Sequence, residues 1–183
     1  MEILEFIQVL VAIILGLGMT ELLRGYADFL RPGERRFSGV LFGFSLWLFL
    51  ALIQFWWAGW RFSVVTTWEF YGLVFYLLGP TILFLLSRLT FPNPSETQDL
   101  VEYYSEVSSR LWTLLGVFYI YAIGSNILLL DVPIWSSGPA SQAFLALYAI
   151  ICSRVENRYL HSVGIVLLMT QLLWRGLGTL VTS

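Results

Sequence analysis

The chain has 183 residues, of which 58% are apolar and 12% are charged, whereas an average soluble domain has roughly 45–50% apolar and about 25% charged residues. With a mean hydropathy of +0.78, the apolar side chains exceed what a water-soluble fold of this size can bury. The composition therefore predicts an integral membrane protein. All ten basic residues are arginines, scattered through a chain of formal net charge −2, which excludes a basic surface for nucleic acid.

Residue types that the chain lacks exclude much of cofactor chemistry. Without lysine there can be no retinal or pyridoxal Schiff base and no P-loop lysine. The single cysteine, Cys152, and the single histidine, His161, exclude an internal disulfide, a thiolate metal cage and bis-histidine haem within one chain. We therefore expect no cofactor and no metal ligands.

Intramembrane proteolysis is also disfavoured. Two serine segments, at Ser45 and Ser125, lack the Gly-x-Ser-Gly pattern of rhomboid proteases. A helix rise of 1.5 Å per residue separates Ser125 from His161 by on the order of 15–20 Å, too far for a hydrogen bond. Paired intramembrane aspartates are missing as well. We therefore expect no catalytic residues and no enzymatic activity.

The apolar segments predict a polytopic all-α bundle that forms one domain over residues 1–183. A hydrocarbon core of ~30 Å needs about 20 apolar helical residues. Six predicted spans cover residues 3–23, 40–60, 70–90, 111–130, 140–152 and 159–181. The fifth is short, which indicates a tilted, shielded or half-inserted helix. The first is a retained span, because Glu2 and Glu5 replace the basic start of a signal peptide.

The segment between spans three and four predicts an amphipathic cytoplasmic helix over residues 95–110 that continues into span four. Ser95 with Gln98 forms a capping-box pattern at its start. One face carries Asp99, Glu102, Glu106 and Arg110, and the other carries Leu100, Tyr104, Val107 and Leu111. The acidic face over Glu96–Arg110 is a candidate docking surface for a basic protein partner, with a merely solvated face as the alternative.

Arginine positions predict the orientation, because cytoplasmic loops collect positive charge. Eight arginines belong to the odd-numbered loops: Arg24, Arg31, Arg35, Arg36, Arg88, Arg110, Arg154 and Arg158. The opposite side has Arg61 and Arg175. Both termini are therefore expected outside. Aromatic residues that anchor a helix at the interface agree with this orientation; they are Trp56, Trp57, Trp60, Trp68, Tyr71, Trp135 and Trp174.

Charged residues inside a membrane span are functional candidates because they are costly there. At the inner ends of the spans we expect a network of Glu21, Arg24, Arg88 and His161, either functional or a set of ion pairs that cap helix ends. At the outer ends, Glu5 and Arg175 lie at matching depth and are expected to pair.

The middle of the membrane is expected to hold only neutral polar groups, which disfavours a proton-coupled transporter. A candidate polar pathway comprises Gln8, Gln54, Thr81, Asn126 and Gln171. Gly79 and Pro80 are expected to break span three near its centre and to free backbone carbonyls. Such a break suits either a pathway for a neutral solute or an ion, or a packing kink.

Span one carries small residues every four positions, at Ala12, Gly16 and Thr20, and we call this set the small-residue stripe. Small residues at this spacing let helix backbones approach closely. Two expectations follow. The stripe packs span one on span six, with Gln8 facing Gln171, or it joins copies in a homo-oligomer.

Two motifs carry a family resemblance. The run ILGLGMTELLRG at residues 14–25 and the run QFWW at residues 54–57 resemble those of small polytopic bacterial inner-membrane proteins of unassigned function. The resemblance implies an all-helical fold in a bacterial inner membrane, with periplasmic termini given the orientation above. It implies no ligand and no catalytic residues.

Two functions are expected from these features. The first is a passive channel or facilitator for a small neutral solute or an ion, formed within the lipid bilayer by one chain or by a homo-oligomer. The alternative is a non-catalytic, membrane-embedded accessory protein that docks a partner through its cytoplasmic loop.

Overall fold

The computed structural model describes residues 3–30, 37–65, 67–93 and 99–180, with side chains up to residue 176. These residues form six α-helices and one 3-10 helix and contain no strand, so the prediction of an all-α fold is confirmed. The elements are α1 (Ile3–Phe29), α2 (Gly39–Ala58), η1 (Gly59–Val64), α3 (Phe70–Thr90), α4 (Leu100–Leu128), α5 (Ser137–Arg154) and α6 (Arg158–Leu180).

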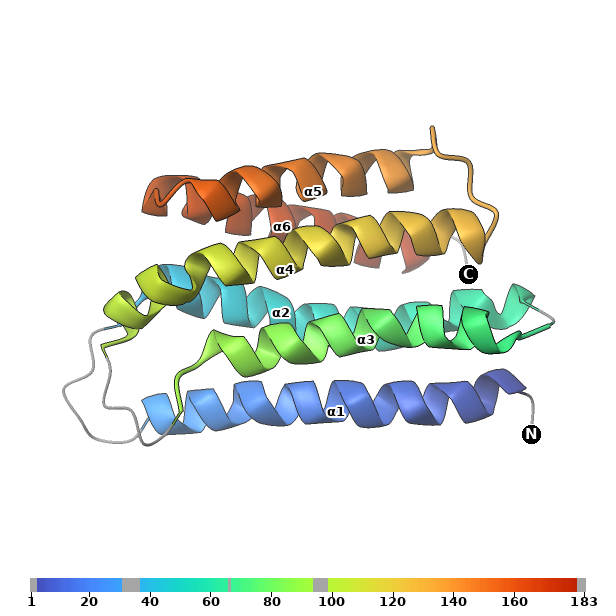
Figure 1. Cartoon of the computed structure of the whole chain (residues 1–183), viewed down its shortest axis with the longest axis horizontal. Helices are drawn as coiled ribbons and strands as arrows, with labels where there is room; N and C mark the ends of the chain where they lie inside the picture. The colour runs from blue at the N-terminus through green and yellow to red at the C-terminus, as the bar shows by residue number, and fades with distance from the viewer. Residues whose placement is uncertain (1–2, 31–36, 66, 94–98, 181–183) are drawn as a thin grey trace.

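Successive helices run in opposite directions (Figure 1). At one end α2, α4 and α6 finish, and Trp56, Trp57, Trp60, Trp135 and Trp174 are exposed there; we call it the tryptophan end. At the other end α1, α3 and α5 finish. We call this the arginine end, because Arg24, Arg88, Arg110, Arg154 and Arg158 lie in the last turns of α1, α3 and α5 or the first turns of α4 and α6.

Four helices are long and apolar enough to cross a membrane, which identifies the chain as a membrane protein. They cover Ile3–Leu30, Gly39–Val64, Phe70–Thr90 and Leu100–Leu128, with mean hydropathies of 2.2, 1.9, 1.9 and 1.6. The helices predicted as spans five and six are present as α5 and α6, with 18 and 23 residues.

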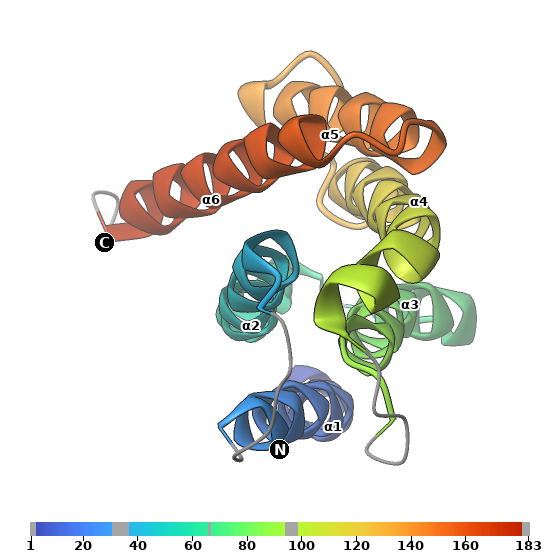
Figure 2. The ribbon, with the colours of Figure 1, turned by 90° about the vertical axis from the view of Figure 1, so that its left-hand side faces the viewer.

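The helix neighbours differ from the predicted ones. α1 packs against α3 and α2, α4 packs against α5 and α3, and α6 lies across α5 and α2 (Figure 2). Over the described ranges α1 and α6 make no contact, so the prediction that spans one and six pack together is wrong. The reason is that α1 buries a different face, on which Gly18 lies close to Ser87 of α3 and Leu52 of α2.

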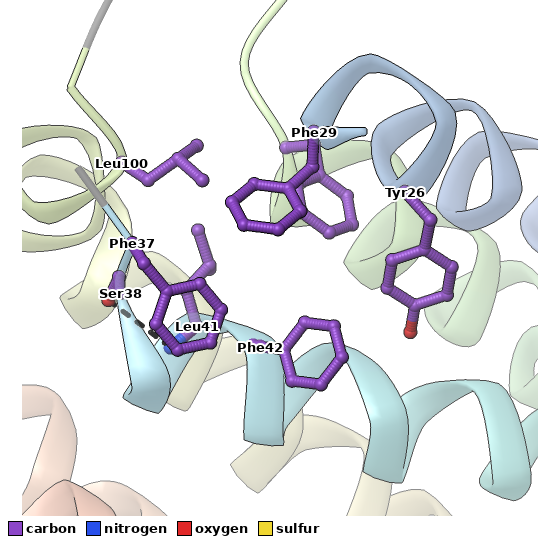
Figure 3. A pocket seen from close by; sticks show the side chains of 8 residues that line it. Tyr26, Phe29, Phe37, Ser38, Leu41, Phe42 and Leu100 are labelled. Carbon is purple, nitrogen blue, oxygen red and sulfur yellow. Dashed lines mark hydrogen bonds between the residues drawn. The ribbon is translucent and has the colours of Figure 1, made fainter. Parts of the chain in front are cut away.

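The interior of the bundle is filled by large side chains. The largest fully buried ones include Trp47, Trp112, Tyr76 and Phe44. A pocket at the arginine end has a volume of about 10 Å³ (Figure 3), room for about one water molecule. Its lining is almost entirely apolar and consists of Tyr26, Phe29, Phe37, Ser38, Leu41, Phe42, Phe91 and Leu100. It therefore offers no space for a solute.

The expected break in span three is absent, because α3 continues through Pro80 to Thr90. Gly79 and Pro80 are both buried. A Cβ atom at Gly79 would lie within 2.7 Å of the rings of Tyr121 and Phe55. The glycine therefore serves close packing of α3 with α4 and α2.

Candidate functional site

The predicted network at the arginine end forms in part. Arg24 donates to Glu21 at 2.6 Å within α1, and a guanidinium nitrogen of Arg88 from α3 lies 3.7 Å from the same carboxylate oxygen. Arg88 also donates to Asn93 at 2.5 Å. Both arginine side chains are about two-fifths exposed. Exposed ion pairs of this kind add little stability, and this group ties the end of α1 to that of α3.

His161 is not part of that group. Its side chain is buried at the start of α6, and its Nδ1 atom lies 2.8 Å from the hydroxyl of Tyr104 on α4. The same hydroxyl accepts a 3.1 Å hydrogen bond from Trp112 Nε1. The Nε2 atom of His161 lies 3.1 Å from the carbonyls of Cys152 and Val155 at the end of α5.

In the neutral form of the imidazole, these contacts assign the position of the ring hydrogen. Because two carbonyls can only accept, Nε2 of His161 carries the proton and donates to them. Nδ1 then accepts from Tyr104, whose oxygen accepts from Trp112. Every polar atom in this buried chain is satisfied, and α4, α5 and α6 are joined by it. We call Trp112, Tyr104 and His161 the aromatic relay. Its hydrogen bonds hold three helices together, which is a structural role.

In the described part of the chain no ion pair joins Arg175 to Glu5, and α1 and α6 are not neighbours there. The Arg175 guanidinium group lies instead beside the Gln142 amide of α5, which is buried. With the amide oriented to accept, the Gln142 oxygen lies 3.2–3.3 Å from both terminal nitrogens of Arg175 and 3.3 Å from Asn126 Nδ2. The guanidinium group of Arg175 is therefore hydrogen-bonded to a neutral amide and not to a carboxylate.

The residues of the candidate polar pathway do not form one line. Most of them form a hydrogen bond to a residue of a neighbouring helix. Gln8 donates to Tyr76 at 3.1 Å, Gln54 donates to the Leu172 carbonyl at 3.1 Å, Gln171 accepts from Tyr119 at 3.2 Å, and Asn126 contacts Gln142. Thr81 is exposed and bonds to its own helix at Leu77. These groups join helices in pairs.

The first turns of α4 have two distinct faces. Glu102, Glu106 and Arg110 are exposed. Leu100, Tyr104, Val107 and Leu111 are buried against neighbouring helices. α4 starts at Leu100 with Asp99 as its N-cap, accepting from Val101 N at 2.9 Å, and runs unbroken to Leu128. The predicted capping pair, Ser95 and Gln98, and also Glu96, lie outside the described residues.

The small-residue stripe lies on the exposed side of α1. Ala12, Gly16 and Thr20 are all exposed, and a Cβ atom at Gly16 would meet nothing within 4 Å. Thr20 donates to the Gly16 carbonyl of its own helix at 2.8 Å. The stripe is therefore not used to pack helices within one chain.

Sequence reasoning missed the aromatic relay, Tyr76 and Gln142. Tyr104 and Trp112 are spaced at i and i+8, which places them on one face of a helix. Together with one histidine in an apolar chain, that spacing is a usable signal. Tyr76 and Gln142 carry no comparable pattern.

Comparisons with known proteins add no relative, because no family model, no curated protein and no solved structure matches the chain.

Proposed function

We propose that this chain is a non-catalytic, membrane-embedded interaction protein that docks a basic partner on the exposed face of the first turns of α4. On this acidic face the described, exposed residues are Glu102, Ser105, Glu106, Ser109 and Arg110. The observation that carries the proposal is that the acidic face is exposed while the same turns are held to three other helices.

Side-chain bonds hold these turns from α3, α5 and α6. Besides the aromatic relay, they join Tyr103 to the Leu89 carbonyl at 2.9 Å, Ser109 to the Ser153 carbonyl at 2.8 Å and Arg158 to the Val101 carbonyl at 3.4 Å. A docking surface gains affinity when its groups are ordered before the partner arrives. These bonds order the backbone that carries the acidic face, which supports the proposal.

The charge of the acidic face favours a basic partner. In the described part of the chain, neither Glu102 nor Glu106 lies within 4.0 Å of a basic group. Carboxylates that are ordered but unpaired are free to form charge-assisted hydrogen bonds with arginine or lysine. Opposite charges also speed and orient the encounter of two proteins.

The packed interior favours an interaction role over conduction through one chain. The neutral polar groups that a pathway would need are bonded in lateral pairs, and buried aromatic rings fill the space between helices. The alternative is the channel or facilitator expected from the sequence, with a pathway that forms between copies of the chain.

The proposal includes six crossings with both termini on the periplasmic side of a bacterial inner membrane. α5 and α6 have lengths of about 27 and 35 Å at 1.5 Å per residue, comparable to a ~30 Å hydrocarbon core. Both expose apolar side chains along their length: Phe144, Leu147, Ile150, Ile151, Val163, Val166 and Leu173. Such faces suit lipid. Among the described arginines, five lie at the arginine end and two at the other, in line with a cytoplasmic arginine end.

Photo-crosslinking in cells tests the docking proposal. A photoreactive residue at Ser105 should crosslink to a partner in the wild-type background and lose that product when Glu102 and Glu106 are both changed to glutamine. The control is Glu156→Gln, which removes an exposed carboxylate at the same end. An unchanged product in the double variant, or a product that contains only a second copy of this chain, would contradict the proposal.

Liposomes test the alternative. Purified protein reconstituted alone should leave the permeability to ions, urea and glycerol at the level of empty liposomes. A clear rise in any of these permeabilities would favour the channel.

A further inference from the structure

Two arginines lie at the tryptophan end without a carboxylate partner. Arg175 is half-buried on α6, and Arg61 is exposed on η1, close enough for its positive charge to act on Arg175. Among the residues with described side chains, no carboxylate oxygen lies within 4.0 Å of either guanidinium group. Two neighbouring positive charges with no counter-charge repel each other, and a bound anion removes that repulsion.

Hydrogen-bond donors outnumber acceptors around Arg175. Gln171, one turn earlier on the same face of α6, has a buried Nε2 atom without a partner, because only its oxygen is used, by Tyr119. The start of α5 lies alongside, with a Cβ position at Gly138 3.4 Å from Arg175 Nη2. An anion with several oxygens would satisfy these donors together.

The start of α5 adds to this surplus of hydrogen-bond donors. Ser136, the N-cap of α5, does not bond its own helix, and its hydroxyl is buried without a partner. The first backbone N–H groups of an α-helix have no intrahelical acceptor and carry partial positive charge. α5 therefore contributes further donors beside Arg175.

The surroundings indicate the level of the lipid headgroups. Trp60 and Trp174 directly precede the two arginines in the chain, and each is 79% exposed. Exposed tryptophans of membrane proteins collect at the boundary between hydrocarbon and water. Phosphate groups of phospholipids lie at that same boundary, whereas a free anion has to come from bulk water.

We propose that Arg175, Arg61 and Gln171 bind a phosphate group, supplied by the headgroup of an anionic phospholipid. Arg175 is suited to phosphate because its planar guanidinium group donates two parallel hydrogen bonds. Gln142 orients Arg175 because its amide oxygen accepts from both terminal nitrogens of the guanidinium group, and the Nε edge stays available for a further acceptor. An anionic headgroup is preferred over a zwitterionic one, since a choline group would bring a third positive charge to the site.

Native mass spectrometry with thermal melting tests the site on the full-length protein. The probes are phosphatidylglycerol, phosphatidylcholine and inorganic phosphate. We expect wild-type protein to retain phosphatidylglycerol about tenfold more strongly than phosphatidylcholine, and Arg175→Gln to lose about that factor, which corresponds to about 1.4 kcal/mol. The matched control, Arg154→Gln, removes an exposed arginine from the other end of α5 and should retain the lipid like wild type.

Arg61→Gln is a second variant for the case that Arg175→Gln fails to fold. Because Arg61 is exposed, its substitution should lower lipid retention without loss of structure. Stabilisation by millimolar inorganic phosphate that vanishes in Arg175→Gln would support the site with a free anion as its source. Equal retention of both lipids, or equal loss in Arg175→Gln and Arg154→Gln, would overturn the proposal.

Discussion

The hydroxyl of Tyr121 on α4 donates a 3.0 Å hydrogen bond to the backbone carbonyl of Tyr76 on α3. In an unbroken helix this carbonyl would accept from the N–H group four residues later, but that residue is Pro80, which has none. Water cannot replace the donor inside a membrane. Tyr121 therefore supplies the bond that the proline removes, and this explains why α3 tolerates a buried proline.

Tyr121→Phe should lower the free energy of unfolding by about 1–3 kcal/mol, because it leaves the Tyr76 carbonyl buried without a donor. The loss should be measured by reversible unfolding of the purified protein in mixed micelles.

Pro80→Ala supplies the control. An alanine at this position restores the helical N–H group, so Tyr121→Phe in the Pro80→Ala background should cost clearly less than in wild type. Equal costs in both backgrounds would show that the tyrosine hydroxyl does not compensate for the proline.

The aromatic relay should behave as a coupled unit. His161→Phe is expected to destabilise the protein by about 1–3 kcal/mol, because Tyr104 and the Cys152 and Val155 carbonyls lose their buried partner. Tyr104→Phe should cost less. In the double variant the combined loss should be smaller than the sum of the single losses, since both changes break one chain of bonds. Additive losses in the unfolding measurement would contradict the coupling.

Gly164 should not tolerate a side chain. A Cβ atom there would lie 2.5 Å from the ring of Trp112 and 2.7 Å from that of Tyr148, so Gly164→Ala should lower the melting temperature by several degrees, at about 1–3 kcal/mol for overpacking. The control is Gly72→Ala in α3, where a Cβ atom meets nothing within 4 Å. That substitution should be neutral or slightly stabilising, because alanine favours helix.

Gly16→Leu should act on self-association. Because a Cβ atom at Gly16 meets nothing within 4 Å, the substitution should leave the melting temperature of the monomer nearly unchanged. If copies join through the small-residue stripe, the bulky side chain should convert an oligomer into a monomer on size-exclusion chromatography with light scattering. An oligomer that survives the change would exclude the stripe as the contact.

Cysteine labelling distinguishes six crossings from four. In a Cys152→Ser background, Ser63→Cys at the tryptophan end and Asn157→Cys between α5 and α6 each place one exposed thiol. With six crossings, a membrane-impermeant maleimide added to intact cells should label position 63 after outer-membrane permeabilisation and should label position 157 only after the inner membrane is opened. Labelling of both positions from the periplasm would contradict six crossings.

The sequence predicted helices well and helix neighbours poorly. The predicted span 70–90 coincides with α3, because a long apolar run in a membrane has no alternative to a helix. Gln8, however, was expected opposite Gln171 and lies against Tyr76. A helix that is apolar on all sides carries little information about which face is buried, so the partner of each polar group could not be derived.

The candidate sites were likewise predictable from the sequence only in part. Glu21, Arg24 and Arg88 could be grouped because opposite charges at equal depth attract. His161 was placed with them on depth alone, and its actual partners are neutral aromatic side chains. Hydrogen bonds between neutral groups leave no charge pattern in the sequence, so the spacing of Tyr104 and Trp112 was the main sequence signal of the aromatic relay.

The neighbour relations of the helices also fit the order of synthesis. α2 and α3 each contact α1, α4 contacts α3, α5 contacts α4, and α6 contacts both α5 and α2. Every helix after the first therefore packs against one that has already left the ribosome. α2, by contrast, meets its partner α6 only at the end of synthesis, when α6 packs against both α2 and α5.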